Sequence, residues 1–201
     1  MLLRPLVPED RERLLAAFER LSDESRYRRF FAPVHSLSDR SVQYLVQIDH
    51  HDHEAIVAID PRTDTLLGVA RYVRQDSAGD RAEAAVVVAD DWQRQGLGRA
   101  LLERLVERAR KEGVARFTAL VQADNRQALE LLSQLGRTTP SLEGELVELD
   151  IELPSRRLGA PLAAALRAAA VSAFGVRPLS ERIARRALEL WESGRKAAER
   201  S

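Results

Sequence analysis

The sequence predicts an α/β (α+β) protein in which a mixed, mostly antiparallel central sheet is flanked by helices and followed by a C-terminal helical extension. Three observations predict it. In the first half, apolar β-branched runs are separated by short turns, the pattern of an antiparallel meander. In the second half, strand-like runs alternate with amphipathic helices, and glycines mark one strand-to-helix turn. Beyond residue 153, apolar residues follow helical spacing.

The first half of the chain is expected to supply the N-terminal helices and the meander. Either Ser22 or Asp23 is expected to cap one helix, and the run Leu37-Ser38-Asp39 is expected to cap another, because serine and aspartate are favoured N-cap residues. Residues 61–64 and 76–80 carry the Pro, Asp, Ser and Gly of tight turns. The expected elements are a strand at 2–6, helices beginning at Pro8, Ser22 and Ser38, and strands at 54–60 and 66–75.

The stretch 83–102 organises the second half. It begins as an apolar strand at 84–89 of the kind expected to be buried, and it passes through a turn with Gly96 and Gly98 into an amphipathic helix. This arrangement aims backbone N–H groups and the positive end of a helix dipole at a phosphate, which a Cβ at either glycine would hold away. The elements expected next are a strand at 116–121, a helix opened by Asn125, and strands at 138–141 and 145–153.

The residues of this turn limit which class of phosphate ligand it can bind. A Walker loop needs Gly-Lys-Ser/Thr, which the sequence lacks, and a dinucleotide fingerprint needs glycine where Leu101 stands. What remains is Q/R-x-x-G-x-G at Gln93, Gly96 and Gly98. It resembles the acetyl-CoA-binding loop of the GNAT superfamily of N-acetyltransferases, and the order of elements over roughly residues 2–153 matches as well. The resemblance implies a GNAT fold and transfer of an acetyl group from acetyl-CoA, as cosubstrate, to an amine.

The resemblance also implies where the cosubstrate binds. The strand at 83–89 should lie beside the pantetheine and bond to it through backbone groups of Val86 and Val88. A backbone N–H near Val87 or Val88 is the expected donor to the oxyanion. The expected cofactor-binding residues are Val86, Val87, Val88, Gln93, Arg94, Gln95, Gly96, Leu97, Gly98, Arg99 and Asn125.

Glu83 is the candidate catalytic residue. It is the one carboxylate inside the apolar strand, where desolvation would raise its pKa toward neutrality, as suits a general base. The alternative is a strand-end glutamate paired with Arg81. Residues 21–31, 49–54 and 82–88 resemble the bacterial protein lysine acetyltransferases that modify acyl-CoA synthetases, in which the strand glutamate is the base. The resemblance therefore implies a protein lysine as acceptor.

One position departs from the family pattern. Many GNAT enzymes have a tyrosine seven residues after the helix-opening asparagine, where it protonates the leaving thiolate, but Leu132 stands there in this chain. Either solvent supplies the proton for the leaving thiolate or the activity is slow. A non-catalytic acyl-CoA-binding regulatory module therefore stays open as an alternative. Acetylation of a small amine or antibiotic is another. The helix at 26–31 is expected to form part of the acceptor wall, with its guanidinium groups docking acidic residues.

Composition limits the partners and the location. The 31 basic and 31 acidic residues give a net charge of zero, which argues against a general nucleic-acid binder. Cysteine is absent, which excludes disulfides, thiol nucleophiles and thiolate metal sites. Three histidines within 49–53 are metal-ligand types, but they are nearly consecutive in an expected loop, so no metal site is predicted. Because no secretory signal is apparent, a cytoplasmic protein is expected.

The sequence predicts two units, an acetyltransferase domain at 1–153 and a helical extension at 154–201. Residues 158–176 are long enough to span a membrane, but alanine is only marginally hydrophobic, so a packed helix is expected and no membrane span. A second amphipathic helix is expected after Pro178. These helices are expected to cover a sheet edge or to form a subunit contact, which makes them the candidate homodimer interface.

Overall fold

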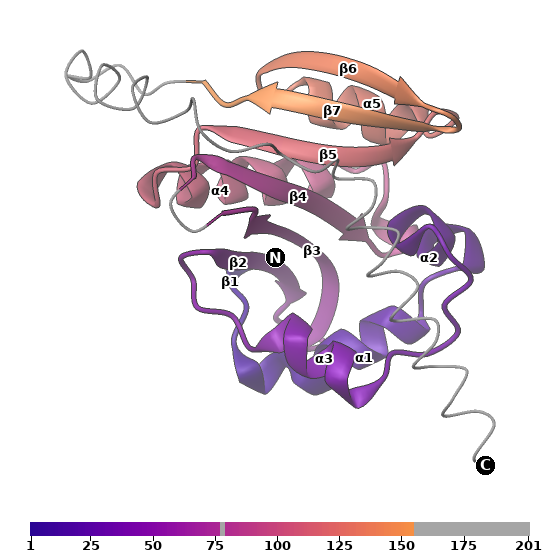
Figure 1. Cartoon of the computed structure of the whole chain (residues 1–201). Helices are drawn as coiled ribbons and strands as arrows, with labels where there is room; N and C mark the ends of the chain where they lie inside the picture. Colours follow the sequence, from indigo (N-terminus) through magenta and orange to yellow (C-terminus); the bar gives the residue numbers. More distant parts are fainter. Residues whose placement is uncertain (77–78, 155–201) are drawn as a thin grey trace.

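A computed structural model describes residues 1–76 and 79–154, and these ranges form one seven-stranded sheet with helices on both faces (Figure 1). The strand order is β1-β2-β3-β4-β5-β7-β6. Among the described strands, β4 and β5 pair in parallel and all other neighbours pair antiparallel. The predicted fold class is confirmed. The helices expected within 154–201, and the homodimer contact assigned to them, lie outside the described residues.

The first half forms the predicted meander from strands β1 (Leu2–Pro5), β2 (His53–Asp60), β3 (Thr65–Arg74) and β4 (Arg81–Val88). The helices before β2 are α1 (Arg11–Glu19), α2 (Asp23–Phe30) and α3 (Asp39–Val46), and short 3-10 turns lie at η1 (Pro8–Asp10) and η2 (Asp90–Trp92). Of the residues expected to cap these helices, Ser22 is the N-cap of α2 and Ser38 is the N-cap of α3. Each accepts a hydrogen bond at 3.2 Å from the backbone N–H three residues later.

The second half consists of α4 (Leu97–Lys111), β5 (Arg116–Gln122), α5 (Arg126–Ser133), β6 (Arg137–Glu143) and β7 (Leu146–Glu152). The strand expected at 138–141 is longer at both ends and becomes β6. Its residues are mostly exposed because it lies at the edge of the sheet, where a proline such as Pro140 is tolerated. An exposed edge strand needs no hydrophobic alternation, so its sequence pattern is weak.

Two layers of helices cover the sheet, as Figure 1 shows: α4 and α5 pack on one face, and α1 and α3 pack on the other. Successive side chains of a strand point to opposite faces. In β4, Ala82 and Ala84 therefore pack with α4, whereas Val87 packs with the aromatic cluster beside α1 and α2. By the same alternation, Glu83 lies on the face of Val87. None of the helices in the described part of the chain has the length and apolar character needed to cross a membrane.

Asp10 is a fully buried carboxylate that ties β1 to α1. It accepts hydrogen bonds from Arg4 at 2.6 and 2.7 Å, from Arg13 at 2.9 Å and from the Val7 N–H at 3.1 Å. Burial alone would raise the pKa of Asp10, but the bonds from Arg4 and Val7 outweigh it and hold this pKa below its ordinary value. The ionised form is therefore part of the folded structure.

We expect Asp10→Asn to lower the free energy of unfolding by about 1–3 kcal/mol at neutral pH, because it leaves the donors around the site without their charged partner. A lowered pKa stabilises the fold above the unfolded-state value of about 4 and stops doing so as the pH falls through the folded-state value. Urea unfolding at pH 7 and pH 3 should therefore show a smaller difference between wild type and variant at pH 3. The control is Asp39→Asn, whose exposed bond to Arg11 at 2.6 Å should contribute less than about 1 kcal/mol. Equal losses in both variants would contradict this account.

Candidate active site

The sheet opens between its two parallel strands. β4 pairs with β3 along its length, up to Val88 opposite Gly68. The pairing with β5 covers only the start of β4, at Arg81 with Arg116, Ala82 with Phe117 and Glu83 with Thr118. From Ala84 onward the edge of β4 that faces β5 is therefore left without a partner strand. An exposed row of backbone donors and acceptors of this kind is suited to binding an extended ligand.

Backbone alternation decides which amides lie on this open edge. The N–H of Ala89, just after β4, donates to the Leu67 carbonyl of β3 at 2.8 Å. Successive peptide groups along a strand point to opposite sides, so Val87 bonds toward β3, whereas the amides of Val86 and Val88 point toward the open edge. Of the three valines predicted to bind the cosubstrate, two thus present backbone donors at this edge. Val87 presents its side chain instead.

A solvent-open cleft with an empty volume of ≈ 1000 Å³ occupies the opening. Val86, Val87 and Val88 are half-buried there, so the expectation of a buried strand fails at this end of β4, because the side chains line a cleft. The lining comes from α2, β4, β5, α5 and the turn after β4, and comprises Ser25, Arg28, Arg29, Phe31, Glu83, Ala84, Ala85, Val86, Val87, Val88, Gln93, Ala119, Leu120, Val121, Asn125, Gln127, Ala128, Leu131 and Leu132.

The glycine turn ends at the uncapped start of α4. The N-cap residue Gly96 provides no side-chain hydrogen bond, and the first turn of α4 contains no acidic residue. The first amides of a helix have no acceptor within it, so those of Leu97, Gly98 and Arg99 are available to an anion. Gly96 has φ of +81° and Arg94 has φ of 58°, a left-handed conformation in which successive N–H groups converge. Converging N–H groups of this kind are suited to binding a phosphate group.

The two glycines are required for different reasons. An added Cβ at Gly96 would meet nothing within 4 Å, so its positive φ, rather than lack of space, favours glycine. At Gly98 a Cβ would lie 3.1 Å from Cδ2 of Leu131, a residue of the cleft. Crowding against a phosphate, the reason inferred from the sequence, is therefore not the only constraint at either position.

We expect Gly96→Ala to weaken acetyl-CoA binding by about fivefold to tenfold, because the left-handed conformation costs an alanine roughly 1 kcal/mol and shifts the amides of the turn. Gly113→Ala is a matched control. Gly113 also has φ of +81° with nothing within 4 Å of an added Cβ, but it follows the other end of α4. Both variants should lose similar stability, and calorimetry should find reduced affinity only in Gly96→Ala. Equal affinities in the two variants would place the ligand elsewhere.

Several side chains predicted to bind the cosubstrate instead hold the turn and the helices in place. The Gln93 amide donates to the Ser25 hydroxyl, the Val88 carbonyl and the Asp90 carboxylate, each at 3.2 Å. The Asn125 side chain caps α5 by accepting from the Ala128 N–H at 3.1 Å. Gln93 and Asn125 nevertheless line the cleft. Of the other side chains in this set, Arg94 is exposed and Leu97 is buried in the core. The Gln95 amide donates to the Asp91 carbonyl, and the Arg99 guanidinium donates to the Glu103 carboxylate.

Glu83 lies at the last position where β4 and β5 pair, half-buried and lining the cleft. Arg81, its alternative partner in the sequence, forms an ion pair with Asp150 at 3.2 Å. Arg29 is an electrostatic partner of Glu83: burial lowers the pKa of Arg29, and the attraction of Glu83 and Tyr44 partly restores it. The candidate base therefore faces a cationic wall.

Arg71 of β3 is a buried cation that is not among the candidate residues inferred from the sequence. Its side chain is 6% exposed, and it donates to Nε2 of His53 at 3.1 Å and to the Leu45 carbonyl at the end of α3 at 3.1 Å. An arginine within a strand that is otherwise rich in apolar residues was the available signal. It was overlooked because a charged residue in a strand is usually assigned to the exposed face.

The guanidinium groups of the predicted acceptor wall differ in where they lie. Arg26 turns inward, where it donates to the Glu19 carbonyl at 2.9 Å and stacks over the ring of Phe18 at 4.8 Å. Its guanidinium is therefore not available to an acceptor. Arg28 and Arg29 line the cleft, and Arg28 also forms an ion pair with Glu24.

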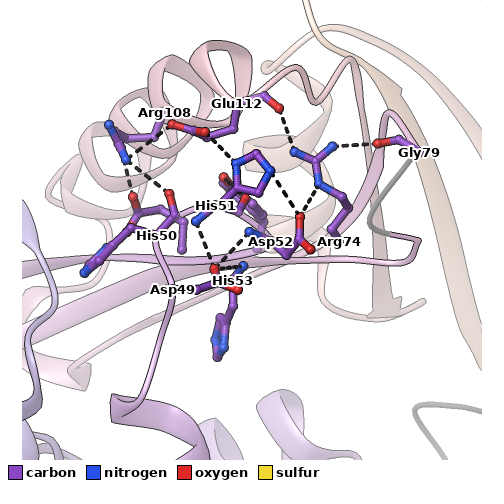
Figure 2. A network of polar contacts seen from close by, with 11 residues as sticks. Asp49, His50, His51, Asp52, His53, Arg74, Gly79, Arg108 and Glu112 are labelled. Atoms are coloured by element: carbon purple, nitrogen blue, oxygen red, sulfur yellow. Dashed lines mark hydrogen bonds and ion pairs between the residues drawn. The ribbon is translucent and has the colours of Figure 1, made fainter.

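The histidines of the loop before β2 take part in a polar network rather than in one cluster (Figure 2). Asp49 accepts three backbone N–H groups at 2.8–2.9 Å, and the ring of His53 points away from the rings of His50 and His51. Within the described ranges, no group of three or more His, Cys, Asp or Glu side chains is placed to hold a metal. The ring contacts are His50 with Glu54 at 2.9 Å, His51 with Glu112 at 2.7 Å and His53 with Arg71 at 3.1 Å.

The position of the missing tyrosine also lies at the cleft. Leu132 is 4% exposed and contributes to the lining. No tyrosine lines the cleft in the part of the chain that the structure describes. The two alternatives inferred from the sequence, a solvent proton for the leaving thiolate or slow activity, therefore both stand.

Comparison with known proteins agrees with this geometry. The sequence matches the Acetyltransferase (GNAT) family over residues 14–136. It is 32% identical over 152 residues to Acetyltransferase Pat of Mycolicibacterium smegmatis, which covers 76% of this chain and 45% of Pat. It is 34% identical over 138 residues to Acetyltransferase PA5475 of Pseudomonas aeruginosa, which covers 68% of this chain and 74% of that protein. The chain thus spans less than half of Pat.

Solved structures give the same result. The GNAT domain of S. lividans PAT superposes with a TM-score of 0.70 at 32% identity, covering 75% of this chain and 89% of that chain. A cAMP-binding acyltransferase from Mycobacterium smegmatis superposes with a TM-score of 0.55 at 29% identity, covering 82% of this chain and 48% of that chain. The chain therefore belongs to the Acetyltransferase (GNAT) family.

Proposed function

We propose that the chain transfers the acetyl group of acetyl-CoA to the side-chain amine of a protein lysine, with Glu83 as general base. The observation that carries the proposal is the place of Glu83, at the point where β4 and β5 separate and the open edge of β4 begins. A base must lie within reach of the reacting amine, and this position borders both the cleft and the face that carries α2.

In the proposed complex, the cosubstrate follows the open edge of β4. The amides of Leu97, Gly98 and Arg99 and the turn before them hold the pyrophosphate. The pantetheine pairs with the edge that carries the amides of Val86 and Val88, as an added strand would. The thioester then lies between these amides and Glu83.

The reaction needs one proton acceptor and one oxyanion donor. A lysine amine has an ordinary pKa of about 10.4, so it must lose a proton before it can attack, and the Glu83 carboxylate accepts that proton directly or through water. The amine nitrogen forms a bond to the thioester carbon, and an edge amide of β4 (Val86 or Val88) stabilises the oxyanion. The C–S bond then breaks, the products are N-acetyl-lysine and CoA, and solvent supplies the thiol proton.

Two features support a protein acceptor. The cleft is open to solvent, and its α2 side carries Arg28, which can pair with acidic groups around a target lysine. The relatives include Acetyltransferase Pat, and three stretches of the sequence resemble the lysine acetyltransferases of acyl-CoA synthetases.

The test is to incubate the chain and acetyl-CoA with a bacterial acetyl-CoA synthetase and to map modified lysines by mass spectrometry. Spermidine and an aminoglycoside serve as parallel acceptors. We expect a specific set of synthetase lysines to be modified, at a rate that falls as salt screens the docking charges over about 8 Å at physiological ionic strength. Fast acetylation of the small amines with no modified lysine would favour a small-amine acetyltransferase. Acetyl-CoA binding without any turnover would favour a regulatory module.

A further inference from the structure

A second cavity lies between the N-terminal helices and the face formed by β3 and β4, and its empty volume of ≈ 580 Å³ includes space open to solvent. Its walls are apolar with two exceptions, the guanidinium groups of Arg29 and Arg71. An apolar cavity with a few placed polar groups is the usual form of a small-molecule site. The apolar lining comprises Leu14, Ala17, Phe18, Leu21, Phe30, Leu37, Leu45, Leu66, Leu67, Gly68, Val69, Val87 and Ala89.

This cavity adjoins the proposed reaction cleft. Arg29 and Val87 line both spaces. Val87 stands between the two residues whose amides lie on the open edge of β4, and its side chain points toward the cavity face. A thioester held at that edge would therefore have its acyl group beside Val87. An acetyl group would end there, whereas a longer acyl chain could continue into the cavity.

The charges around the cavity leave a positive excess. The two hydrogen bonds of Arg71 go to neutral acceptors, Nε2 of His53 and the Leu45 carbonyl. Burial, together with repulsion from Arg29, lowers the pKa of Arg71 to about 9, so the guanidinium is still charged at neutral pH. The charged groups that face one another here are the cations Arg29 and Arg71 and the anion Glu83, with the Tyr44 hydroxyl nearby. One further negative charge would balance this group.

We propose that the cavity receives acyl groups longer than acetyl and favours those that end in a carboxylate, so that the chain also transfers a dicarboxylic acyl group such as succinyl from its CoA thioester. The aliphatic carbons would lie against the apolar wall, and the terminal carboxylate would accept hydrogen bonds from Arg29 and Arg71, whose planar groups match its geometry. This inference rests on the proposed function for its thioester position, and it names the acyl donor.

The chemical step is unchanged. The amine nitrogen bonds to the thioester carbon of the succinyl group, the C–S bond breaks, and CoA leaves as the thiolate and is protonated. The amine proton goes to Glu83, and the terminal carboxylate stays ionised throughout. No oxidant or reductant takes part.

Three CoA thioesters test the proposal in the wild-type chain: acetyl-CoA, butyryl-CoA and succinyl-CoA. Butyryl and succinyl have the same chain length and differ in the terminal carboxylate. We expect calorimetry to show succinyl-CoA binding about 10- to 100-fold more tightly than butyryl-CoA, as one charge-assisted hydrogen bond would give. The same ratio should appear in kcat/KM with the synthetase acceptor.

Variants assign the preference to the arginines. Arg71→Met should bring the succinyl-to-butyryl ratio close to one, and Arg71→Lys, which keeps the charge, should retain part of it. Arg29→Met removes the other arginine and should lower the same ratio, and it serves as the test if the loss of the buried Arg71 disturbs folding. Arg104→Met, an exposed arginine of α4 paired with Glu107, is the control and should leave the ratio unchanged.

The outcomes separate this inference from the function on which it rests. Binding of acetyl-CoA with equal affinities for butyryl-CoA and succinyl-CoA would overturn the inference and leave the proposed function standing. A succinyl preference that survives both Arg71→Met and Arg29→Met would also overturn it. Failure to bind any of the three thioesters would contradict the proposed cosubstrate site itself.

Discussion

Replacing Glu83 by glutamine should lower kcat by about 10²–10⁴-fold, the usual contribution of a general base, while acetyl-CoA affinity stays nearly the same. The amide keeps the shape of the side chain but cannot accept the amine proton. Mass spectrometry of the acceptor in samples quenched at set times measures kcat, and calorimetry measures the affinity for acetyl-CoA. Because unprotonated amine becomes more abundant as the pH rises, the variant should lose least activity at the alkaline end of a profile from pH 6 to 9.

Glu148→Gln is the matched control for this prediction. Glu148 is a half-buried strand glutamate of β7, and burial, with repulsion from Glu143 and Asp150, raises its pKa. By pKa alone it is a rival base, but it does not line the cleft. Geometry takes precedence over pKa in choosing a base, so Glu148→Gln should keep most of the activity. A large loss in Glu148→Gln, with wild-type turnover in Glu83→Gln, would reverse the assignment.

Replacing Gly98 by valine should weaken acetyl-CoA binding by roughly 10- to 100-fold, the cost of about 1–3 kcal/mol for an overpacked site. The first atom of the new side chain would lie 3.1 Å from Leu131 and 3.7 Å from Val88, both of which line the cleft. The Leu131 side chain must therefore shift by a few tenths of an ångström. Calorimetry on the folded variant gives the affinity.

A double variant separates two explanations for that loss. If displacement of Leu131 is the cause, Gly98→Val combined with Leu131→Ala should recover much of the affinity, since the two positions are in contact. If the valine blocks the phosphate directly, as the sequence suggested, the second change should restore nothing. Unchanged affinity in folded Gly98→Val would count against the turn as a cosubstrate site.

The elements with strong local signals could be predicted from the sequence. The serine caps of α2 and α3, the amphipathic stripe of α4 and the β-branched runs of β2 and β3 are all formed within residues that are close in the chain. Each signal reflects an interaction within one element or one hairpin, and tertiary packing did not override it. The weak prediction of β6 follows from its place at the sheet edge, where side chains are free to be polar.

Features that depend on several distant elements could not be predicted. The separation of β4 from β5 depends on where strands of different parts of the chain stop pairing, and no local pattern encodes it. The inward turn of Arg26 depends on Phe18 of α1, and the cavity with Arg71 depends on three helices packed over two strands. The catalytic candidate was found because a carboxylate in an apolar strand is conspicuous in sequence, whereas its cationic neighbours lie in other elements.

A crystal structure with bound acetyl-CoA tests the central claim most directly. The account predicts that the pyrophosphate accepts hydrogen bonds from amides at the start of α4, including those of Leu97, Gly98 and Arg99. It also predicts that the pantetheine pairs with the open edge of β4 through Val86 and Val88, with the thioester carbon within reach of Glu83. A cosubstrate bound away from this edge, or a thioester carbon outside the reach of Glu83, would contradict the account.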